Sequence, residues 1–180
     1  MAEKRGLLII HTGKGKGKTT AALGLALRAW GGSARVLILQ FIKGGQNCGE
    51  LAALEKIAAL SGLGKISLKR CGLGFAKSDG ENFPEHRAAA QEALNQAKDA
   101  FAADWDMIIL DEINYAVDFG LISKEELLAL IKLRPASLHL VLTGRNALPE
   151  VIELADLVTE MTEIKHPFAK GVKAQEWIEY

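Results

Sequence analysis

The sequence predicts an α/β fold, in which one mainly parallel sheet is covered by helices on both faces. Short apolar runs alternate along the chain with longer helical segments, and this alternation is typical of βαβ units. Almost half of the residues are hydrophobic, which is enough to bury a sizeable core. No internal repeat and no linker for a second domain is visible, so we expect a single domain over residues 1–180.

The expected strands are short runs rich in leucine, isoleucine and valine. The first run, Leu7–His11, is compact and apolar and leads into a glycine-rich turn, as expected of a buried strand. Five further strands are expected later in the chain, two of which, Lys65–Lys69 and Leu157–Glu160, are short. They are Arg35–Ile42, Lys65–Lys69, Asp106–Leu110, Leu138–Leu142 and Leu157–Glu160.

The expected helices are longer and carry recognisable start and stop signals. An alanine- and leucine-rich helix spans Lys18–Trp30 and is closed by a glycine pair. Pro84 suits the first turn of a helix, and Ser123 with Glu126 forms a capping box. The remaining helices are expected over Glu50–Leu60, 84–103, 123–133 and Pro149–Leu154.

Two segments lack periodicity and are expected to be irregular. The glycine-containing segment Cys71–Phe83 is interpreted as a long loop, and loops of this length are often functional. The tail from His166 to Tyr180 is the second segment. Its aromatic residues Trp177 and Tyr180 are expected to pack on the core, with ligand contact as the alternative.

Charge and cysteine content narrow the function classes. The 22 basic and 22 acidic residues balance, which argues against a broad surface for nucleic acid or membrane. The two cysteines, Cys48 and Cys71, have no metal-ligand spacing around them and fit a reducing compartment. No secretory signal and no apolar run near the ~20 residues of a membrane span is visible. We therefore expect a cytoplasmic protein.

A local cluster of glycines and lysines follows the first strand, in the order Gly13, Lys14, Gly15, Lys16, Gly17, Lys18, Thr19 and Thr20. The pattern resembles the phosphate loop G-x-x-x-x-G-K-[ST], except that the position of its first glycine holds Thr12. Glycines let backbone amides turn toward an anion, and the helix amino end adds partial positive charge. A solvated basic loop is the alternative, but these lysines would repel one another without an anion.

The loop residues have distinct expected roles in binding ATP. Lys18 reaches phosphate oxygens, and Lys14 and Lys16 add further positive charge. The hydroxyl of Thr19 is a ligand for Mg²⁺, which keeps several waters and bridges phosphates. Mn²⁺ is an acceptable substitute.

Polar residues at the ends of later strands complete the predicted nucleotide site. Asp111 and Glu112 follow an apolar strand, which is a Walker-B pattern, and Asp111 can hold Mg²⁺ directly or through water. Glu112 could bind the metal or orient a reacting group. Arg145 is a candidate phosphate or ribose contact. Lys43, at the end of the second strand, is a further candidate residue of the site. Ordinary surface positions are the alternatives for these charged residues.

These residues predict a P-loop nucleotide-binding protein, but they leave its chemistry open. A phosphotransferase or ATPase would use Glu112 to position a hydroxyl or a water. A non-enzymatic ATP-binding module would show no turnover. The residue types and spacings alone do not choose among these classes.

Resemblance to a known family narrows the choice. The strings HTGKGKGKTTAALGLALRAWG, QFIKGG, LDEINYAVDFGLI, LTGR and KHPFAKGVKAQEWIEY resemble those of the ATP:corrinoid adenosyltransferases. They occur in order over nearly the whole chain, and the family has the same shortened glycine spacing in its phosphate loop. The resemblance implies a RecA-like P-loop fold that holds the nucleotide in the reverse sense along the loop.

The resemblance also implies a reaction and its participants. Reduced Co(I) of a corrinoid attacks the 5′ carbon of ATP, the triphosphate leaves, and a cobalt–carbon bond forms. Lys18 and Glu112 are then expected to be catalytic, with metal binding at Thr19, Asp111 and Glu112. A homodimer and an electron-donating flavoprotein partner are further implications of the family.

In the family, an aromatic pair in the loop after the third strand displaces the lower axial ligand of the corrinoid cobalt. Phe75, after Gly74, matches the first aromatic and is expected to be catalytic in this sense. The second aromatic falls at Lys77, which departs from the family pattern. Phe83 and Trp105 are candidate substitutes, and a role as a loop anchor in the core is the alternative for Phe75.

Overall fold

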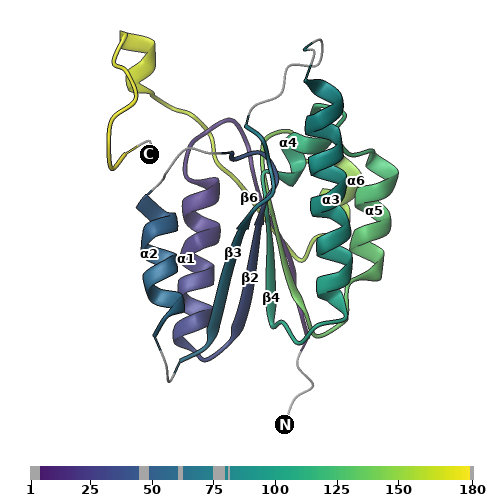
Figure 1. The fold of residues 1–180 in the computed structure, drawn as a ribbon. Helices are drawn as coiled ribbons and strands as arrows, with labels where there is room; N and C mark the ends of the chain where they lie inside the picture. The colour runs from purple at the N-terminus through teal and green to yellow at the C-terminus, as the bar shows by residue number, and fades with distance from the viewer. Residues whose placement is uncertain (1–4, 45–48, 61–62, 75–79, 81, 179–180) are drawn as a thin grey trace.

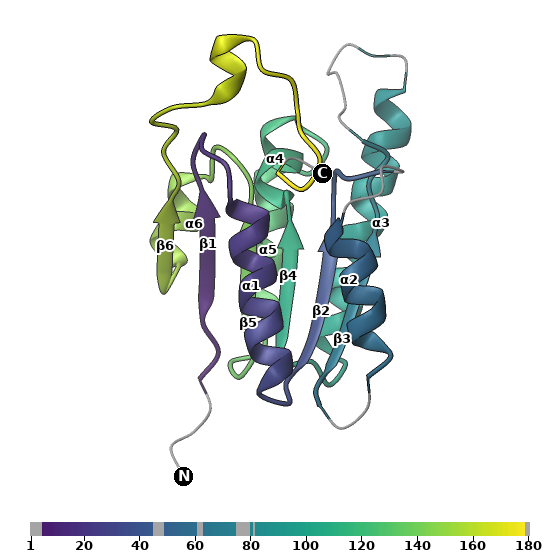
Figure 2. The same cartoon turned by 90° about the vertical axis from the view of Figure 1, so that its left-hand side faces the viewer.

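The computed structural model describes residues 5–44, 49–60, 63–74, 80 and 82–178. A single six-stranded sheet runs through these residues in the order β3-β2-β4-β5-β1-β6. Every strand pair is parallel, and in Figure 2 the arrowheads point to the same edge. The strands are β1 (Leu8–Thr12), β2 (Arg35–Gln40), β3 (Lys65–Arg70), β4 (Met107–Asp111), β5 (His139–Thr143) and β6 (Leu157–Glu160).

Helices cover both faces of this sheet (Figure 1). One face carries α1 (Lys18–Gly31) and α2 (Gly49–Ala58). The opposite face carries α3 (Phe83–Phe101), α4 (Ile113–Asp118), α5 (Lys124–Leu133) and α6 (Pro149–Leu154). The chain crosses the sheet in one direction from β1 to β3 and returns from β3 to β6. Because parallel crossovers are right-handed, this reversal places the two sets of helices on opposite faces. The predicted α/β fold is confirmed.

Side chains of alternate strand residues fill the core on either side of the sheet. Ile9 and Ile109 belong to the buried cluster beneath α1, whereas Leu8 and Ile108 belong to the cluster beneath α3 and α5. A strand buried on both faces has no polar side. This explains why β1, β2, β4 and β5 appear in the sequence as nearly continuous apolar runs, whereas the edge strands β3 and β6 are more exposed and more polar.

Three features differ from the sequence-based expectations. Helix α4 was not predicted, because it has only six residues and follows Glu112, whose φ of 62° interrupts any continuous helical pattern. The tail expected to be irregular contains a 3₁₀ turn, η1 (Pro167–Lys170). The expectation of core packing is wrong for Trp177, whose exposed fraction is 89%. Tyr180 lies outside the described residues.

The capping box predicted at Ser123 is confirmed. Its hydroxyl accepts a hydrogen bond from the backbone amide of Glu126, and the Glu126 carboxylate accepts one from the backbone amide of Ser123.

Among the described residues, no helix has the length and hydropathy needed to cross a membrane.

Candidate functional site

The carboxyl ends of the strands form the edge at which the predicted site residues meet. Helix α1 follows β1 and helix α6 follows β5, and these two helices lie on opposite faces of the sheet (Figure 1). Because β1 and β5 are neighbours, their following loops diverge and leave a crevice at this edge. The loop 13–17 and the turn 144–146 border that crevice from the two strands.

The phosphate loop wraps around the side chain of Lys18. Gly13 and Gly17 have φ angles of 95° and 102°, which L side chains adopt only at a cost. The Lys18 Nζ donates hydrogen bonds to the carbonyl oxygens of Gly13 and Gly15, at 2.8 and 2.7 Å. Only 6% of Lys18 is exposed. The loop therefore holds the ammonium group at its centre.

The segment after β6 supports this loop from behind. Gly15 donates its backbone amide to the carbonyl of Met161 at 2.7 Å, and Met161 donates its own amide to the carbonyl of Thr12 at 2.9 Å. A β-carbon added to Gly13 would lie 2.4 Å from the Met161 carbonyl oxygen. The close approach of these two backbones, together with positive φ, explains the glycine at position 13.

The amino end of α1 is suited to bind an anion. Its cap, Gly17, contributes no side-chain hydrogen bond, and no acidic residue lies in the first turn. The backbone amides of this turn therefore have no side-chain carboxylate competing for them, and the helix dipole adds positive potential. Lys14 and Lys16 are exposed on the loop before it. Phosphate is the ligand that this combination favours.

Asp111 lies at the end of β4 and is surrounded by hydrogen-bond donors. Its Oδ1 accepts from the hydroxyls of Thr19 and Thr143, at 2.9 and 2.7 Å. Its Oδ2 accepts from the amide nitrogen of Gln40 at 2.9 Å. Asp111 is 1% exposed. The structure brings Thr19 and Asp111 together, whereas the contacts from Gln40 and Thr143 were not anticipated from the sequence.

Glu112 is placed beside Asp111 by an unusual backbone conformation. Its φ of 62° lies in the left-handed region, and its backbone amide donates to the Thr143 hydroxyl at 2.8 Å. Burial, together with the neighbouring charge of Asp111, raises the pKa of the Glu112 carboxyl, and Lys18, Lys43 and Arg145 oppose this rise. These three cations therefore lie within electrostatic range of Glu112.

The same cluster acts on Lys18. Burial lowers the pKa of its ammonium group, and Arg145 lowers it further, whereas Glu112 and Asp111 raise it. The cationic groups of the site are thus balanced against two carboxylates in a partly buried setting. An anionic ligand such as a triphosphate would relieve the repulsion between Lys18 and Arg145.

Two cavities flank the phosphate loop and share Arg145 and Asn146 in their walls. The first, of about 580 Å³, is bordered by Lys18, Thr19, Glu112 and the α4 side of the crevice. The second, of about 760 Å³, lies toward β6. Besides the shared pair, it is lined by Thr12, Gly13, Lys14, Ala147, Ile152, Val158, Glu160, Thr162 and Glu163. Both volumes are in the range of small-molecule sites.

An aromatic pair forms part of the wall of the smaller of these cavities. The ring of Tyr115 on α4 stacks on that of Phe119, which directly follows the helix, with centroids 4.1 Å apart and an interplanar angle of 15°. Burial, followed by the charge of Glu112, raises the pKa of the Tyr115 hydroxyl. This cavity is therefore lined by both aromatic rings and charged side chains.

The oxygen ligands at this edge fit Mg²⁺. Thr19 and Asp111 supply a hydroxyl and a carboxylate, with Glu112 adjacent. Among the described residues, no group of three or more histidines, cysteines or acidic residues could hold a metal by itself. Mg²⁺ is normally held by one or two carboxylates together with phosphate and water, rather than by a cage of protein ligands.

The aromatic candidates for the corrinoid site lie in different parts of the molecule or outside the described residues. Phe75 and Lys77 lie outside the described residues. Trp105 is excluded as a substitute, because it lies beside Arg35 and Lys65, which begin β2 and β3, with its ring 5.6 and 5.2 Å from their charged groups. It is therefore at the amino-terminal edge of the sheet. Phe83 begins α3 and packs partly on the core.

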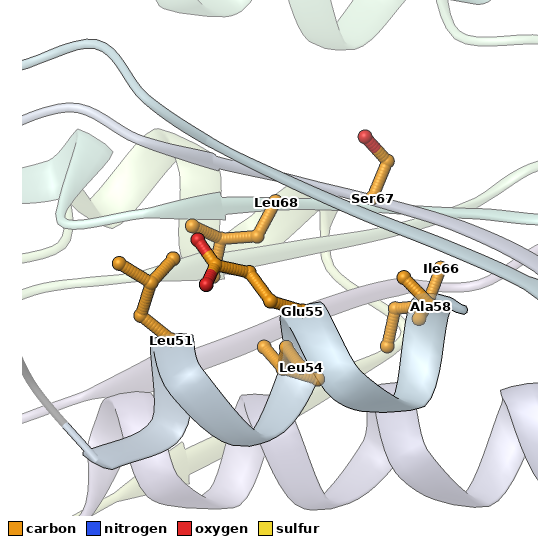
Figure 3. Close-up of a pocket in the computed structure, with 7 residues that line it drawn as sticks. All are labelled: Leu51, Leu54, Glu55, Ala58, Ile66, Ser67 and Leu68. Atoms are coloured by element: carbon orange, nitrogen blue, oxygen red, sulfur yellow. The ribbon is translucent and has the colours of Figure 1, made fainter. Parts of the chain in front are cut away.

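A smaller apolar cavity, of about 180 Å³, lies between α2 and β3 and away from this site (Figure 3). Leu51, Leu54 and Ala58 of α2 face Ile66 and Leu68 of β3 across it, and Ser67 points away from the helix. Among the described residues that line it, Glu55 is the single ionisable one. The composition is that of a packing crevice between a helix and an edge strand.

Comparison with known proteins agrees with the geometry of the site. Residues 4–180 match the family described as ATP:corrinoid adenosyltransferase BtuR/CobO/CobP. A corrinoid adenosyltransferase of Pseudomonas aeruginosa is 38% identical over 180 residues, covering 99% of this chain and 85% of that protein. Those of Escherichia coli and Salmonella typhimurium are 38% and 36% identical, each covering 99% of this chain and 87% of the relative. The chain belongs to the ATP:corrinoid adenosyltransferase family.

Proposed function

We propose that this protein transfers the 5′-deoxyadenosyl group of ATP to the Co(I) centre of a reduced corrinoid, in the synthesis or salvage of adenosylcobalamin. The electron pair of Co(I) forms the bond to the 5′ carbon, the bond from that carbon to the triphosphate oxygen breaks, and triphosphate leaves. Membership of the family, joined to a phosphate loop closed around Lys18, is the observation that carries the proposal.

The proposed task of the protein is to position ATP and to stabilise the leaving triphosphate. The corrinoid supplies the nucleophile, so no strong protein base is needed. Lys18, the backbone amides of residues 13–17 and the amino end of α1 would bind the phosphates. Lys14, Lys16, Thr20 and Arg145 border the same cavities and would add contacts. Because both cavities meet at Arg145, a triphosphate lying along the loop would reach either one.

We further propose that Thr19, Asp111 and Glu112 hold Mg²⁺, or Mn²⁺ in its place, against the phosphates. The bound ion would neutralise charge on the leaving group. Thr19 and Asp111 are already joined by a hydrogen bond of 2.9 Å, which supports a shared role. The raised pKa of the Glu112 carboxyl and its cationic neighbours support a position for Glu112 at the edge of the same site.

The remaining parts of the proposal rest on the family resemblance or on composition. Phe75 would contact the corrinoid and help to displace the lower ligand of cobalt. A flavoprotein would supply the electron, and the protein would act as a homodimer. A cytoplasmic location is consistent with the presence of only two cysteines.

Product analysis tests the proposal against a phosphotransferase or ATPase of the same fold. The protein is incubated anaerobically with ATP, Mg²⁺ and chemically reduced cobalamin, and the phosphorus products are separated. Adenosyl transfer yields tripolyphosphate. ADP and phosphate in its place would show that the bond broken lies between phosphates, and would refute the proposed reaction.

A further inference from the structure

Four polar side chains form a row across the carboxyl end of the sheet. Gln40 of β2 pairs in register with Asp111 of β4. Thr143 of β5 pairs with His11 of β1, and the register of the strands between them places Thr143 beside Asp111. All four residues are at most 7% exposed.

The row faces α1. In each strand, the residue two positions earlier belongs to the buried cluster beneath that helix: Ile38, Ile109, Val141 and Ile9. Because side chains alternate along a strand, the polar residues point to the same face. Thr19, in the first turn of α1, contacts this row by donating a hydrogen bond from its hydroxyl to Asp111.

Hydrogen bonds to Asp111 limit how it can serve a metal. Oδ1 already accepts from two hydroxyls and Oδ2 from the amide of Gln40. A carboxylate that is nearly fully buried and has three donors is poorly placed to bind an ion directly. Thr19 is partly exposed and lines the cavity, and its hydroxyl oxygen keeps a lone pair while its hydrogen is donated to Asp111. Asp111 is therefore arranged to act through Thr19.

Gln40 occupies this row although a partly unpaired amide is costly there. Its Oε1 is buried and has no hydrogen-bond partner among the described residues. A half-paired buried amide costs free energy compared with an apolar side chain, so stability alone does not explain it. Its Nε2, in contrast, is 2.9 Å from Oδ2 of Asp111 and leaves Oδ1 to Thr19.

We propose that Gln40 is a positioning residue for Asp111 and, through it, for the metal ligand Thr19: its amide fixes one carboxylate oxygen of Asp111 so that the other orients the Thr19 hydroxyl toward the metal. This inference rests on the proposed function, because it assumes that Thr19 binds the divalent ion of ATP. Groups that orient metal ligands commonly change metal affinity by about 10–100-fold when they are removed.

Mn²⁺ binding to the protein with ATP, in the absence of corrinoid, tests the inference without relying on activity. Electron paramagnetic resonance counts free Mn²⁺ during a titration. Gln40→Met is expected to weaken Mn²⁺ binding at least about tenfold, with ATP binding in excess chelator changed less than about twofold. Gln91→Met is the matched control, since Gln91 also donates to a carboxylate, that of Glu126, at 3.2 Å between α3 and α5. It should bind Mn²⁺ as the wild type does.

A double-mutant cycle separates positioning from a general structural effect. If Gln40 acts through Asp111, Gln40→Met should have no further effect on Mn²⁺ affinity in an Asp111→Asn background. Should Gln40→Met not fold, Gln40→Asn keeps a polar side chain but withdraws the amide from Asp111, and the same result is expected.

Three outcomes would overturn the inference. The first is unchanged Mn²⁺ affinity in Gln40→Met, and the second is a loss of ATP affinity in excess chelator as large as the loss of Mn²⁺ affinity. The third is that the effects of Gln40→Met and Asp111→Asn on Mn²⁺ affinity are additive. The titration of the wild type is read first, because it tests the proposed function separately. If the wild-type protein with ATP binds no Mn²⁺, the proposed metal role is itself wrong.

Discussion

Lys18 combines burial with charge at the centre of the phosphate loop. Its ammonium group bridges the carbonyls of Gly13 and Gly15, and burial lowers its pKa while Glu112 and Asp111 oppose that effect. The side chain is thus held by the loop before any phosphate arrives. Preorganised charge of this kind contributes most where negative charge develops during reaction.

Lys18→Ala should cost at least ~3 kcal/mol in transition-state stabilisation, about two orders of magnitude in rate, because the leaving triphosphate loses its buried cation. The rate of adenosylation at saturating ATP measures the effect. Lys56→Ala, which removes an exposed lysine of α2, is the control and should react at the wild-type rate. Turnover near normal in Lys18→Ala would exclude the assigned role.

Glu112 carries a stability cost that depends on pH. Its folded-state pKa is raised, chiefly by burial, so the folded protein binds a proton more tightly than the unfolded chain does. The contribution of Glu112 to stability is therefore most favourable below the ordinary carboxyl value of 4.5 and is lost as pH rises through the raised pKa. At neutral pH, the ionised Glu112 carboxylate therefore lowers the free energy of unfolding.

Glu112→Gln should make the nucleotide-free protein more stable than the wild type at neutral pH, with the difference vanishing below pH 4.5. Activity should fall at the same time, since the carboxylate is lost from the site. Urea unfolding across this pH range is the measurement, and Glu153→Gln, an exposed position on α6, is the control. A constant difference at all pH values would contradict the assigned electrostatics.

At the scale of elements, the phosphate loop depends on a strand that is distant in sequence. Met161, just after β6, accepts from Gly15 and donates to Thr12, so the loop is supported by a segment about 150 residues further on. The glycine pattern of the loop was evident in the sequence. Its support was not, because sequence periodicity does not reveal which strand lies beside β1.

Gly13→Ala is expected to destabilise the protein by about 1–3 kcal/mol and to weaken ATP binding, because φ is 95° and the new methyl group would meet Met161. Gly24→Ala is the opposite case. Gly24 is in α1 with no atom within 4 Å of its added β-carbon, so alanine should stabilise by about 0.5–1 kcal/mol. Thermal unfolding compares the two variants. Equal effects would contradict the support assigned to Met161.

Most elements could be predicted, because buried strands and capped helices leave strong local signals. Helix α1 was visible from its alanines and leucines, and α5 from its capping box at Ser123. Helix α4 left no such signal, since it has six residues and begins after the left-handed Glu112. The sequence therefore predicts polar residues at the end of β4, but no helix directly after them.

At the scale of the whole molecule, strand order assembles the site. The chain leaves β1 for β2 across two positions that β4 and β5 later fill. This order brings Gln40, Asp111, Thr143 and His11 to one level of the sheet. Local sequence predicted Asp111 as a strand-end carboxylate, but its neighbours Gln40 and Thr143 could be recognised only once the order was known.

The central claim is that this fold uses its phosphate loop to release triphosphate from the 5′ carbon of ATP. The most direct measurement is the visible spectrum during anaerobic incubation with ATP, Mg²⁺ and Co(I) cobalamin. The spectrum of adenosylated cobalamin should replace that of Co(I), with tripolyphosphate formed in equal amount. Persistence of the Co(I) spectrum, with ATP either intact or split to ADP, would contradict the account.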